Sequence, residues 1–328
     1  MKKASMKAVV CTRYGSPDFL KVRHITRPTP GSKEIRIKVY ASAVTAADTM
    51  MRRAIPKVSK LFLGWNKPKK DVMGTGFAGI VEAVGKEVSK WRVGDQVFGE
   101  AGLDFGANAE YLVMPEDGVI MKKPLNISFE AAATICDGPL TSLNFLKELG
   151  QIQAGDRVLI NGASGALGTA AVQLAKYYGA HVTGVCGPSN IAMVAKLGAD
   201  RVLDYTKVDF TEEGKTYDII YDTVGKSSFA KAKKALAPTG RYLSPVLDLQ
   251  LLFQMIWTSK FSKKKALFSA TGLMPSLRLR EMGATLSELI ATEQLKIVVD
   301  KVYQLDDAAA AHRYVDSGHK RGNVVLVA

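Results

Sequence analysis

A run of small residues between a predicted strand and a predicted helix is the feature of this sequence most suited to chemistry. In RVLINGASGALGTAAVQLAK, residues 157–176, an apolar strand pattern gives way to small residues and then to good helix formers. Ala163, Gly165 and Gly168 occupy the three small-residue positions of a dinucleotide-binding turn, with alanine at the first. Such a turn lets backbone N–H groups approach a pyrophosphate at the positive end of the helix. The predicted phosphate-binding residues are Ala163, Ser164, Gly165, Ala166, Leu167 and Gly168.

The end of the next predicted strand indicates which dinucleotide would bind. A site that prefers NAD usually carries Asp or Glu about 20 residues after the glycine turn. Here residues 185–190 read VCGPSN, so no carboxylate is present to repel a 2′-phosphate. Ser189 and Asn190 can donate hydrogen bonds to such a phosphate. The sequence therefore predicts NADPH in preference to NADH.

Cysteine and histidine residues give no metal-binding or disulfide pattern. The three cysteines are an odd number without a C-x-x-C pair, and the four histidines lack ligand spacing. We therefore expect no bound metal, no disulfide framework, reduced thiols and a cytoplasmic location. The residues are Cys11, Cys136 and Cys186, with His24, His181, His312 and His319.

The elements that must position the glycine turn alternate between strand and helix. From about residue 128 the pattern predicts a parallel, doubly wound α/β sheet of the Rossmann type. We expect strands at 156–161, 181–186, 201–203, 217–222, 240–244 and 267–270, with helices at 166–178, 189–197 and 227–236.

The remainder of the chain is rich in short apolar runs punctuated by glycine and proline, which is typical of an irregular β-domain. The tail returns to this texture, with a strand predicted at 296–302, a helix at 306–317 and a strand at 323–327. We therefore expect a β-rich domain made of residues 1–126 and 271–328, interrupted by the Rossmann domain at 127–270.

Length and composition indicate a folded protein with a large core. The chain has 328 residues, 47% of them hydrophobic and 23% charged, with a net charge of +14. A solvated basic face is the simplest interpretation of this charge, and we expect no specific nucleic-acid partner. The longest apolar region, 246–257, is shorter than the roughly 20 residues of a spanning helix, so we predict no transmembrane segment and no signal peptide.

Many short motifs in a shared order carry a family resemblance. They include MKAVVCTRYGSPDFLKV, GTGFAGIVEAVGKEV, WRVGDQVFG, AAATICDGPLTSLNFL, NGASGALG, KLGADRVLDY, YDIIYDTVG and HKRGNVVLV. The chain resembles the zinc-free quinone oxidoreductase branch of the medium-chain dehydrogenase/reductase superfamily, the group that includes zeta-crystallin. The resemblance implies a GroES-like catalytic domain around the Rossmann domain, a homodimer, and NADPH-dependent reduction of quinones or α,β-unsaturated carbonyls.

The resemblance also implies where a catalytic zinc would sit in metal-dependent relatives. Matching motifs place those ligand positions at Thr45, Thr75 and Asp137, and only the aspartate could hold a metal. A quinone or enone delocalises the developing charge over its own conjugated system, so zinc is not required. Thr45 is then the candidate donor to the substrate carbonyl.

Three other positions are implied to be catalytic, and two of them keep structural alternatives. Asp48 resembles the family's carboxylate after the catalytic strand, or it caps a helix. Asp137 binds an alcohol or carries a proton, or it caps the helix predicted near Pro139. Thr141 is implied to line the nicotinamide end of the site.

The remaining cofactor contacts come from the same resemblance. Tyr205 is expected near the 2′-phosphate, Val224 and Gly225 beneath the nicotinamide ribose, Ser244 and Ser269 near the nicotinamide amide, and Asn323 where many relatives carry lysine.

The sequence leaves several alternatives open. The apolar, basic segment 247–265 suits a cap over the substrate, a dimer contact, or docking on a membrane surface through Trp257 and Phe261. An alcohol or aldehyde dehydrogenase that works without zinc remains the enzymatic alternative, and an NADPH-binding sensor the non-catalytic one.

Overall fold

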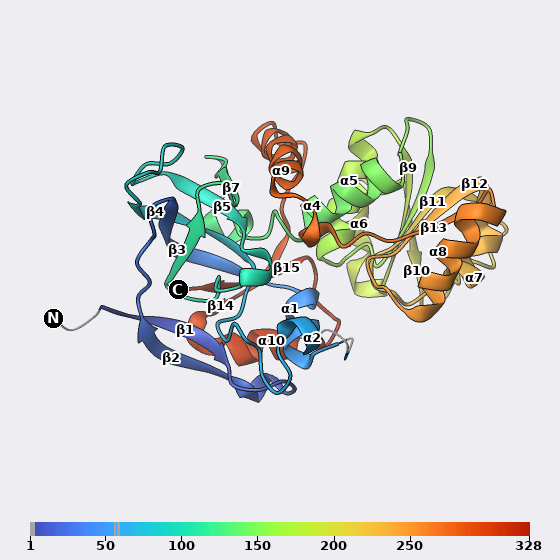
Figure 1. Ribbon diagram of the computed structural model, residues 1–328. Coiled ribbons are helices and arrows are strands. Elements are labelled where there is room, and N and C mark those ends of the chain that lie inside the picture. The colour runs from blue at the N-terminus through green and yellow to red at the C-terminus, as the bar shows by residue number, and fades with distance from the viewer. Residues whose placement is uncertain (1–3, 56, 58–59) are drawn as a thin grey trace. The chain divides into compact units, whose positions relative to one another are not determined.

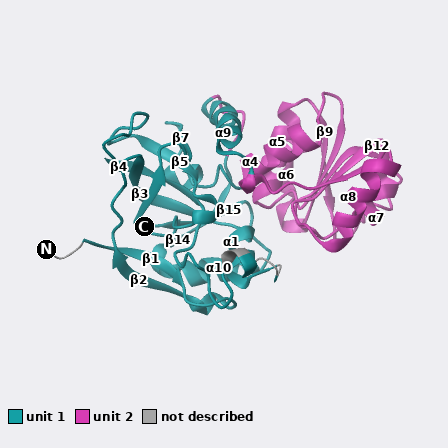
Figure 2. Cartoon of the chain, viewed as in Figure 1, with its two compact units in different colours: residues 1–137, 274–291, 297–328 teal, residues 138–273, 292–296 magenta. Residues whose placement is uncertain are grey.

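The computed structural model describes residues 4–55, 57 and 60–328, and the chain divides into two compact units (Figures 1 and 2). Unit 2 consists of Gly138–Leu273 and Thr292–Lys296, and the rest of the chain forms unit 1. The boundaries predicted from the sequence lie at 126/127 and 270/271, whereas these units divide at 137/138 and 273/274.

Unit 2 contains the parallel sheet expected of a Rossmann fold. Its strands follow the order β10-β9-β8-β11-β12-β13, and every neighbouring pair is parallel. The order reverses between β8 and β11, which is where doubly wound sheets bind their ligands. The strands are β8 Arg157–Asn161, β9 His181–Cys186, β10 Arg201–Asp204, β11 Tyr217–Asp222, β12 Leu236–Leu243 and β13 Lys265–Leu267.

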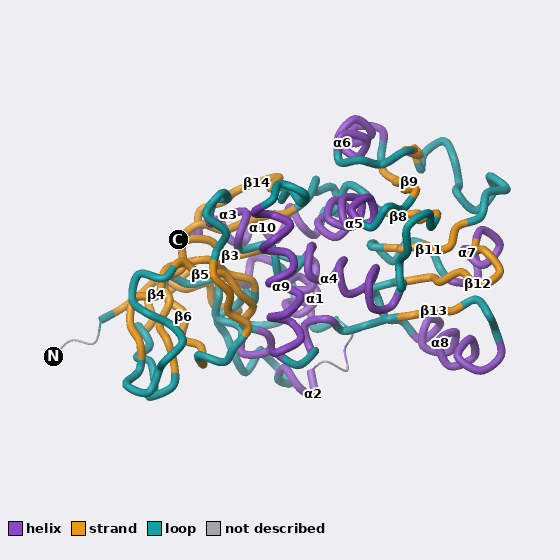
Figure 3. The backbone as a smooth tube through the Cα atoms, turned by 90° about the horizontal axis from the view of Figure 1, so that it is seen from above, coloured by secondary structure: helices purple, strands orange, loops and turns teal. Residues whose placement is uncertain are grey.

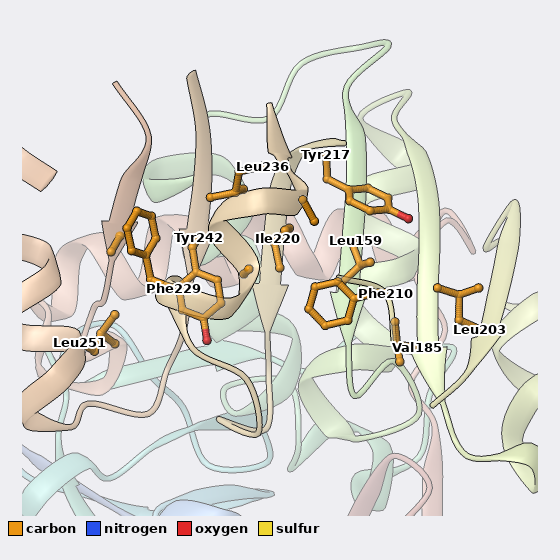
Figure 4. Close-up of a cluster of buried hydrophobic side chains, with 13 residues drawn as sticks. Leu159, Val185, Leu203, Phe210, Tyr217, Ile220, Phe229, Leu236, Tyr242 and Leu251 are labelled. Atoms are coloured by element: carbon orange, nitrogen blue, oxygen red, sulfur yellow. The ribbon is translucent and has the colours of Figure 1, made fainter. Parts of the chain in front are cut away.

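Helices cover both faces of this sheet. On one face, Phe229 and Leu251 pack with Ile220 and Tyr242 in a buried hydrophobic cluster (Figure 4). On the other face, Phe145 stacks on Tyr221 with the ring centroids 5.1 Å apart. The helices of unit 2 are α4 Gly138–Leu143, α5 Ala166–Tyr177, α6 Ile191–Lys196, α7 Phe229–Ala232 and α8 Leu249–Phe261, with a π-helix over Asn144–Leu149.

Unit 1 combines both ends of the chain, as the sequence predicts. Over the described residues its larger sheet has the order β14-β15-β3-β4-β5-β7, β6 also pairs with β3, and β1 pairs with β2. The C-terminal strand β15 lies antiparallel to β3, with Val325 opposite Ala43. The strands are β1 Ser5–Cys11, β2 Leu20–Thr26, β3 Glu34–Val44, β4 Gly76–Val84, β5 Gln96–Glu100, β6 Tyr111–Pro115, β7 Val119–Lys122, β14 Val299–Gln304 and β15 Asn323–Val327, and the helices are α1 Ala46–Arg53, α2 Lys60–Leu63, α3 Phe129–Ala132, α9 Ser276–Ala291 and α10 Ala308–Asp316.

The sequence-based prediction was wrong about the last strand of the parallel sheet. A strand was expected at 267–270, but β13 covers Lys265–Leu267. The lysine is tolerated in this edge strand because its ammonium donates to the carbonyl groups of Thr258 and Ser259 at the end of α8. A long helix was likewise expected at 227–236, whereas α7 has four residues and β12 already begins at Leu236.

Candidate functional site

The glycine turn leads directly from β8 into α5 and packs tightly against the start of that helix. Gly162 has a left-handed backbone with φ +81°, so the chain turns at this residue rather than at Ala163, the position matched from the motif. A Cβ on Gly168 would lie 2.1 Å from the Gly162 carbonyl oxygen, so only glycine lets α5 pack this closely on the strand end. The turn and the helix start therefore lie in contact, as the motif requires.

The N-terminus of α5 is suited to an anion. Gly165 is the N-cap residue, and no side chain accepts a hydrogen bond from the first turn. A Cβ on Gly165 would have only the Gly162 carbonyl oxygen nearby, at 3.5 Å, so space remains beside the N–H groups. An uncapped helix start with open space beside it fits the pyrophosphate of a nicotinamide dinucleotide.

The predicted 2′-phosphate residues gather at the carboxyl ends of β9 and β10. The Tyr205 ring lies next to Gly187, because a Cβ on that glycine would be 3.5 Å from the ring. Asn190 donates a side-chain hydrogen bond to the Ser164 hydroxyl at 3.2 Å, which ties this edge to the glycine turn, and Ser189 is exposed.

A carboxylate that the sequence reasoning missed also stands at this edge. Asp204, at the end of β10, lies opposite Cys186 in the strand register. Its Oδ1 accepts hydrogen bonds from the Thr206 backbone and hydroxyl, which lower the pKa of the Asp204 carboxyl. A carboxylate is therefore present at the carboxyl end of β10, although the carboxyl end of β9 has none.

Asp222 organises the loop that holds Val224 and Gly225, and the sequence analysis did not single it out. It is fully buried at the end of β11, and its two oxygens accept hydrogen bonds from the Gly225 and Ser227 N–H groups, at 3.1 and 2.8 Å. The Asn161 amide and the Tyr242 hydroxyl donate to the same carboxylate, at 2.9 and 3.0 Å. The only signal in the sequence is its position at the end of the predicted strand YDIIYD, three residues before Gly225.

The two serines expected near the nicotinamide amide are already hydrogen-bonded. Ser244 is buried and donates to the Val246 carbonyl oxygen at 3.3 Å, and a Cβ on Gly225 would meet Val246. Ser269 accepts a hydrogen bond from the Asn144 amide at 3.0 Å. Both serines follow the carboxyl ends of their strands, β12 and β13, just as the glycine turn follows the carboxyl end of β8. All three therefore lie at the same end of the parallel strands.

In unit 1, Thr45 and Asp48 form a capping box at the start of α1. The Asp48 N–H donates to the Thr45 hydroxyl at 3.0 Å, and the Thr45 N–H donates to Asp48 Oδ2 at 2.8 Å. The Thr45 hydroxyl also donates to Oδ2, at 2.8 Å. Asp48 therefore caps a helix, as its structural alternative predicted. The hydroxyl hydrogen of Thr45, the candidate donor to substrate, is already bound by the Asp48 carboxylate.

Two carboxyl groups in this part of unit 1 have raised pKa values, the fully buried Asp48 of the cap and the partly buried Glu100. Burial raises the pKa of Asp48 to about 6 against the opposing hydrogen bonds from Thr45, and Asp48 Oδ1 has no hydrogen-bond partner within the described part of the chain. Burial also raises the pKa of Glu100 to about 8, opposed by a hydrogen bond from the Thr75 hydroxyl. Glu100 was not predicted from the sequence.

Asp137 carries a third carboxyl group in this part of unit 1. Burial raises its pKa, an effect that the positive charge of Lys320 opposes. Burial in turn lowers the pKa of the Lys320 ammonium. Asp137 directly precedes α4 in the sequence, and both interpretations of its role, proton carrier or helix cap, stay predictions.

The residues at the zinc-ligand positions of metal-dependent relatives do not fit zinc. Thr45 and Thr75 offer hydroxyl groups that already interact with Asp48 and Glu100, which leaves Asp137 as the one carboxylate of the three. Among the described residues, no three His, Cys, Asp or Glu side chains are arranged to hold a metal ion.

Two predicted site residues have their own local settings. Thr141 lies half-buried in α4 of unit 2. Asn323, in unit 1, is buried at the start of β15, where its side-chain amide donates to the Val298 carbonyl oxygen at 3.0 Å.

Comparison with protein families matches both units. A family model described as "Alcohol dehydrogenase GroES-like domain" matches residues 31–125, and one described as "Zinc-binding dehydrogenase" matches residues 197–326.

Individual relatives match along the whole chain. A quinone oxidoreductase of Sus scrofa is 30% identical, over 97% of this chain and 95% of its own length. An NADPH-dependent alkenal/one oxidoreductase of Arabidopsis thaliana is 28% identical, over 98% and 79%. Among solved structures, the Escherichia coli quinone oxidoreductase complexed with NADPH is similar at a TM-score of 0.84, with 26% identity over 99% of this chain and 100% of the other.

Proposed function

Because the chain belongs to the quinone oxidoreductase branch of the medium-chain dehydrogenase/reductase superfamily and is an oxidoreductase, we propose that it uses NADPH to reduce quinones or α,β-unsaturated carbonyls. The observation that carries this proposal is the uncapped start of α5 at Gly165, next to a turn that requires glycine at positions 162 and 168. The relatives named for quinone and for alkenal/one reduction support the acceptor class.

The residues of unit 2 would hold the cofactor, which when bound supplies a hydride for transfer. N–H groups of the first turn of α5 would bind the pyrophosphate. Asp222 would keep Val224 and Gly225 in place beneath the nicotinamide ribose, because it fixes the loop through two backbone hydrogen bonds. Fixing the loop in advance lowers the entropy lost when the cofactor binds.

We assign the preference for NADPH to the edge formed by β9 and β10. Ser189, Asn190 and Tyr205 provide hydrogen-bond donors there, and Lys207 adds a positive charge close to Asp204. One oxygen of the Asp204 carboxylate, Oδ1, already accepts hydrogen bonds from the Thr206 N–H and hydroxyl. The NADPH complex of the Escherichia coli relative is consistent with this assignment.

The proposed acceptor is a compound whose own conjugated system stabilises the negative charge that develops on its oxygen during hydride transfer. A simple ketone needs a Lewis acid at its oxygen, and the hydroxyl groups of Thr45 and Thr75 are poor substitutes for zinc ligands. A quinone or an enone spreads the charge by conjugation and needs orientation and a proton. We therefore propose that reduction here is independent of zinc.

Asp137 is the proposed source of that proton. Burial raises the pKa of its carboxyl group, and the side chain makes no hydrogen bond within the described residues, so it holds a proton more tightly than an exposed aspartate and can donate it. The positive charge of Lys320 opposes the rise in the pKa of Asp137, and the negative charge of Asp137 helps to raise the pKa of Glu100. Thr45 becomes free to donate only when a proton reaches Asp48 Oδ2.

NADPH oxidation followed at 340 nm tests the proposal, with a quinone, an enone and a simple aldehyde as acceptors and the metal content measured on the same sample. Turnover with the quinone or the enone in metal-free protein is expected. Turnover with the aldehyde alone would instead favour an alcohol or aldehyde dehydrogenase, and one zinc per chain required for activity would overturn the metal-free mechanism.

The homodimer and the cytoplasmic location remain predictions. No helix of the described residues is long and apolar enough to cross a membrane. Sedimentation velocity of the purified protein measures its oligomeric state directly.

A further inference from the structure

The outer side of α8 carries a continuous stripe of large apolar side chains. The residues recur at spacings of three and four, which places them on one face of the helix. Their exposure is high, with 76% for Leu249, 71% for Phe253 and 72% for Phe261. The stripe consists of Leu249, Leu252, Phe253, Ile256, Trp257 and Phe261.

The stripe is separate from the face that anchors α8 to unit 2. Leu251 and Thr258, on the opposite side of the helix, are buried, and Met255 packs against the hydrophobic cluster of the sheet. Asp248 caps the first turn by accepting a hydrogen bond from the Leu251 N–H at 2.7 Å. Figure 3 shows α8 beside the edge strand β13. The helix is therefore fixed without the stripe, whose side chains have no partner that the core requires.

Lysine side chains flank the C-terminal half of the stripe. Lys260 lies on the same helix face, and Lys263 follows the end of the helix, both exposed. Lys233, from the turn after α7, places its ammonium 5.4 Å from the centre of the Trp257 ring. Within the described part of the chain none of these three lysines forms an ion pair. Lys234 nearby is neutralised by Glu212.

We propose that α8 docks the protein onto an anionic lipid surface, with the apolar stripe entering the boundary between headgroups and acyl chains. Aromatic and aliphatic side chains that protrude beside lysines are what such interfaces bind, because apolar burial adds to attraction toward anionic headgroups. The helix has 13 residues, about 20 Å of length, so it lies on the membrane and does not cross it.

A second copy of the chain fits this surface less well. A two-fold contact through α8 would bring two sets of unpaired lysines together within proteins that each carry a net charge of +14. The carboxylate at the start of the helix, Asp248, is occupied by its cap. Charge complementarity therefore favours a lipid surface as the occupant.

Co-flotation of the full chain with vesicles tests the proposal. Vesicles of phosphatidylcholine alone are compared with vesicles that also contain about 30 mol% of the anionic lipid phosphatidylglycerol. We expect binding to the anionic vesicles at low salt. The double variant Phe253→Ser/Trp257→Ser should lose it, and the matched control Leu125→Ser/Trp65→Ser, which removes two exposed apolar side chains elsewhere, should keep it.

Charge-reversal variants measure how much the lysines contribute to vesicle binding, apart from the apolar stripe. Lys260→Glu/Lys263→Glu should weaken partitioning by about 30-fold or more, since each lysine near an anionic surface contributes about a factor of five to ten. The control Lys86→Glu/Lys122→Glu changes the net charge equally at exposed sites in unit 1. An equal loss in both double variants would overturn the proposal, because it would show a response to net charge alone.

The fluorescence of Trp257 reports the depth of insertion. Vesicles with brominated acyl chains should quench the wild-type emission, and the quenching should disappear in Trp257→Phe. If the wild-type protein does not float with anionic vesicles, the lipid proposal is wrong. If Phe253→Ser/Trp257→Ser in addition converts a dimer into a monomer in sedimentation velocity, the stripe is a contact between two copies.

Discussion

The Thr45 hydroxyl and the Asp48 carboxylate are bound to each other in both directions at the start of α1. The hydroxyl donates to Oδ2 and accepts from the Asp48 N–H, so its one hydrogen is in use. A residue that resemblance implies to be a catalytic donor is therefore first of all a helix cap. Any donation to substrate depends on the protonation of Asp48.

Replacing Thr45 separates these two roles. Thr45→Val should cost about 1 kcal/mol of stability, because the cap hydrogen bond is lost, while Thr45→Ser should retain it. If the hydroxyl also donates to substrate, kcat for quinone reduction should fall at least about tenfold in the valine variant only. Thermal unfolding and steady-state kinetics on both variants measure the two effects, and equal kcat values would confine Thr45 to capping.

Asp137→Asn should lower kcat and remove its dependence on pH. A carboxyl group that supplies a proton must be protonated, and burial raises the pKa of Asp137, so wild-type kcat should fall as the pH rises through that pKa. The amide cannot titrate, and we expect a loss of about 10²-fold at the optimum with a flat profile. Asp104→Asn, at an exposed carboxylate of unit 1, serves as the control. An unchanged profile in Asp137→Asn would contradict the assignment.

Glu100→Gln should change the pH dependence of stability. The folded-state pKa of Glu100 is about 8, above its ordinary value, so its protonated form stabilises the fold below about pH 4.5 and this contribution is lost as the pH rises toward 8. The glutamine variant has no such loss. Its stability relative to wild type should therefore increase by about 1–3 kcal/mol between pH 5 and pH 8, allowing for partial exposure. Denaturant titrations at both pH values check this, and a difference independent of pH would contradict it.

Asp222→Asn should weaken cofactor binding more than acceptor binding. The substitution removes the charge that holds the Gly225 and Ser227 N–H groups, and charge-assisted hydrogen bonds contribute about 1.5–3 kcal/mol each. We expect KM for NADPH to rise about tenfold or more, with KM for the quinone nearly unchanged. A parallel rise in both constants would indicate general unfolding, which circular dichroism of the same samples would reveal.

Ser189→Asp should weaken the preference for NADPH over NADH. A carboxylate at the end of β9 repels a 2′-phosphate and accepts hydrogen bonds from ribose hydroxyls, so the ratio of kcat/KM for NADPH over NADH should fall at least about tenfold. Ser259→Asp, on the exposed side of α8, controls for the added charge. A wild-type enzyme that uses both cofactors equally would remove the basis of this prediction.

The sequence alone determined the order of elements and the place of the glycine turn, because strand and helix periodicities and small-residue turns are local properties. It also predicted that both chain ends share one domain, which β15 beside β3 confirms. It placed the turn at Ala163, one residue from the glycine that takes the left-handed backbone, since spacing does not reveal φ.

Only the tertiary structure decided what surrounds each side chain. Asp222, Glu100 and Lys320 are ordinary charged residues in the sequence, and their roles depend on burial and on partners more than 15 residues away, such as Asn161 and Thr75. For the segment 247–265 the sequence leaves three interpretations open, and only the fold shows which face of α8 packs on the sheet and which face is exposed. Hydrogen-bond partners, desolvation and exposed faces arise from long-range packing, and no local pattern records them.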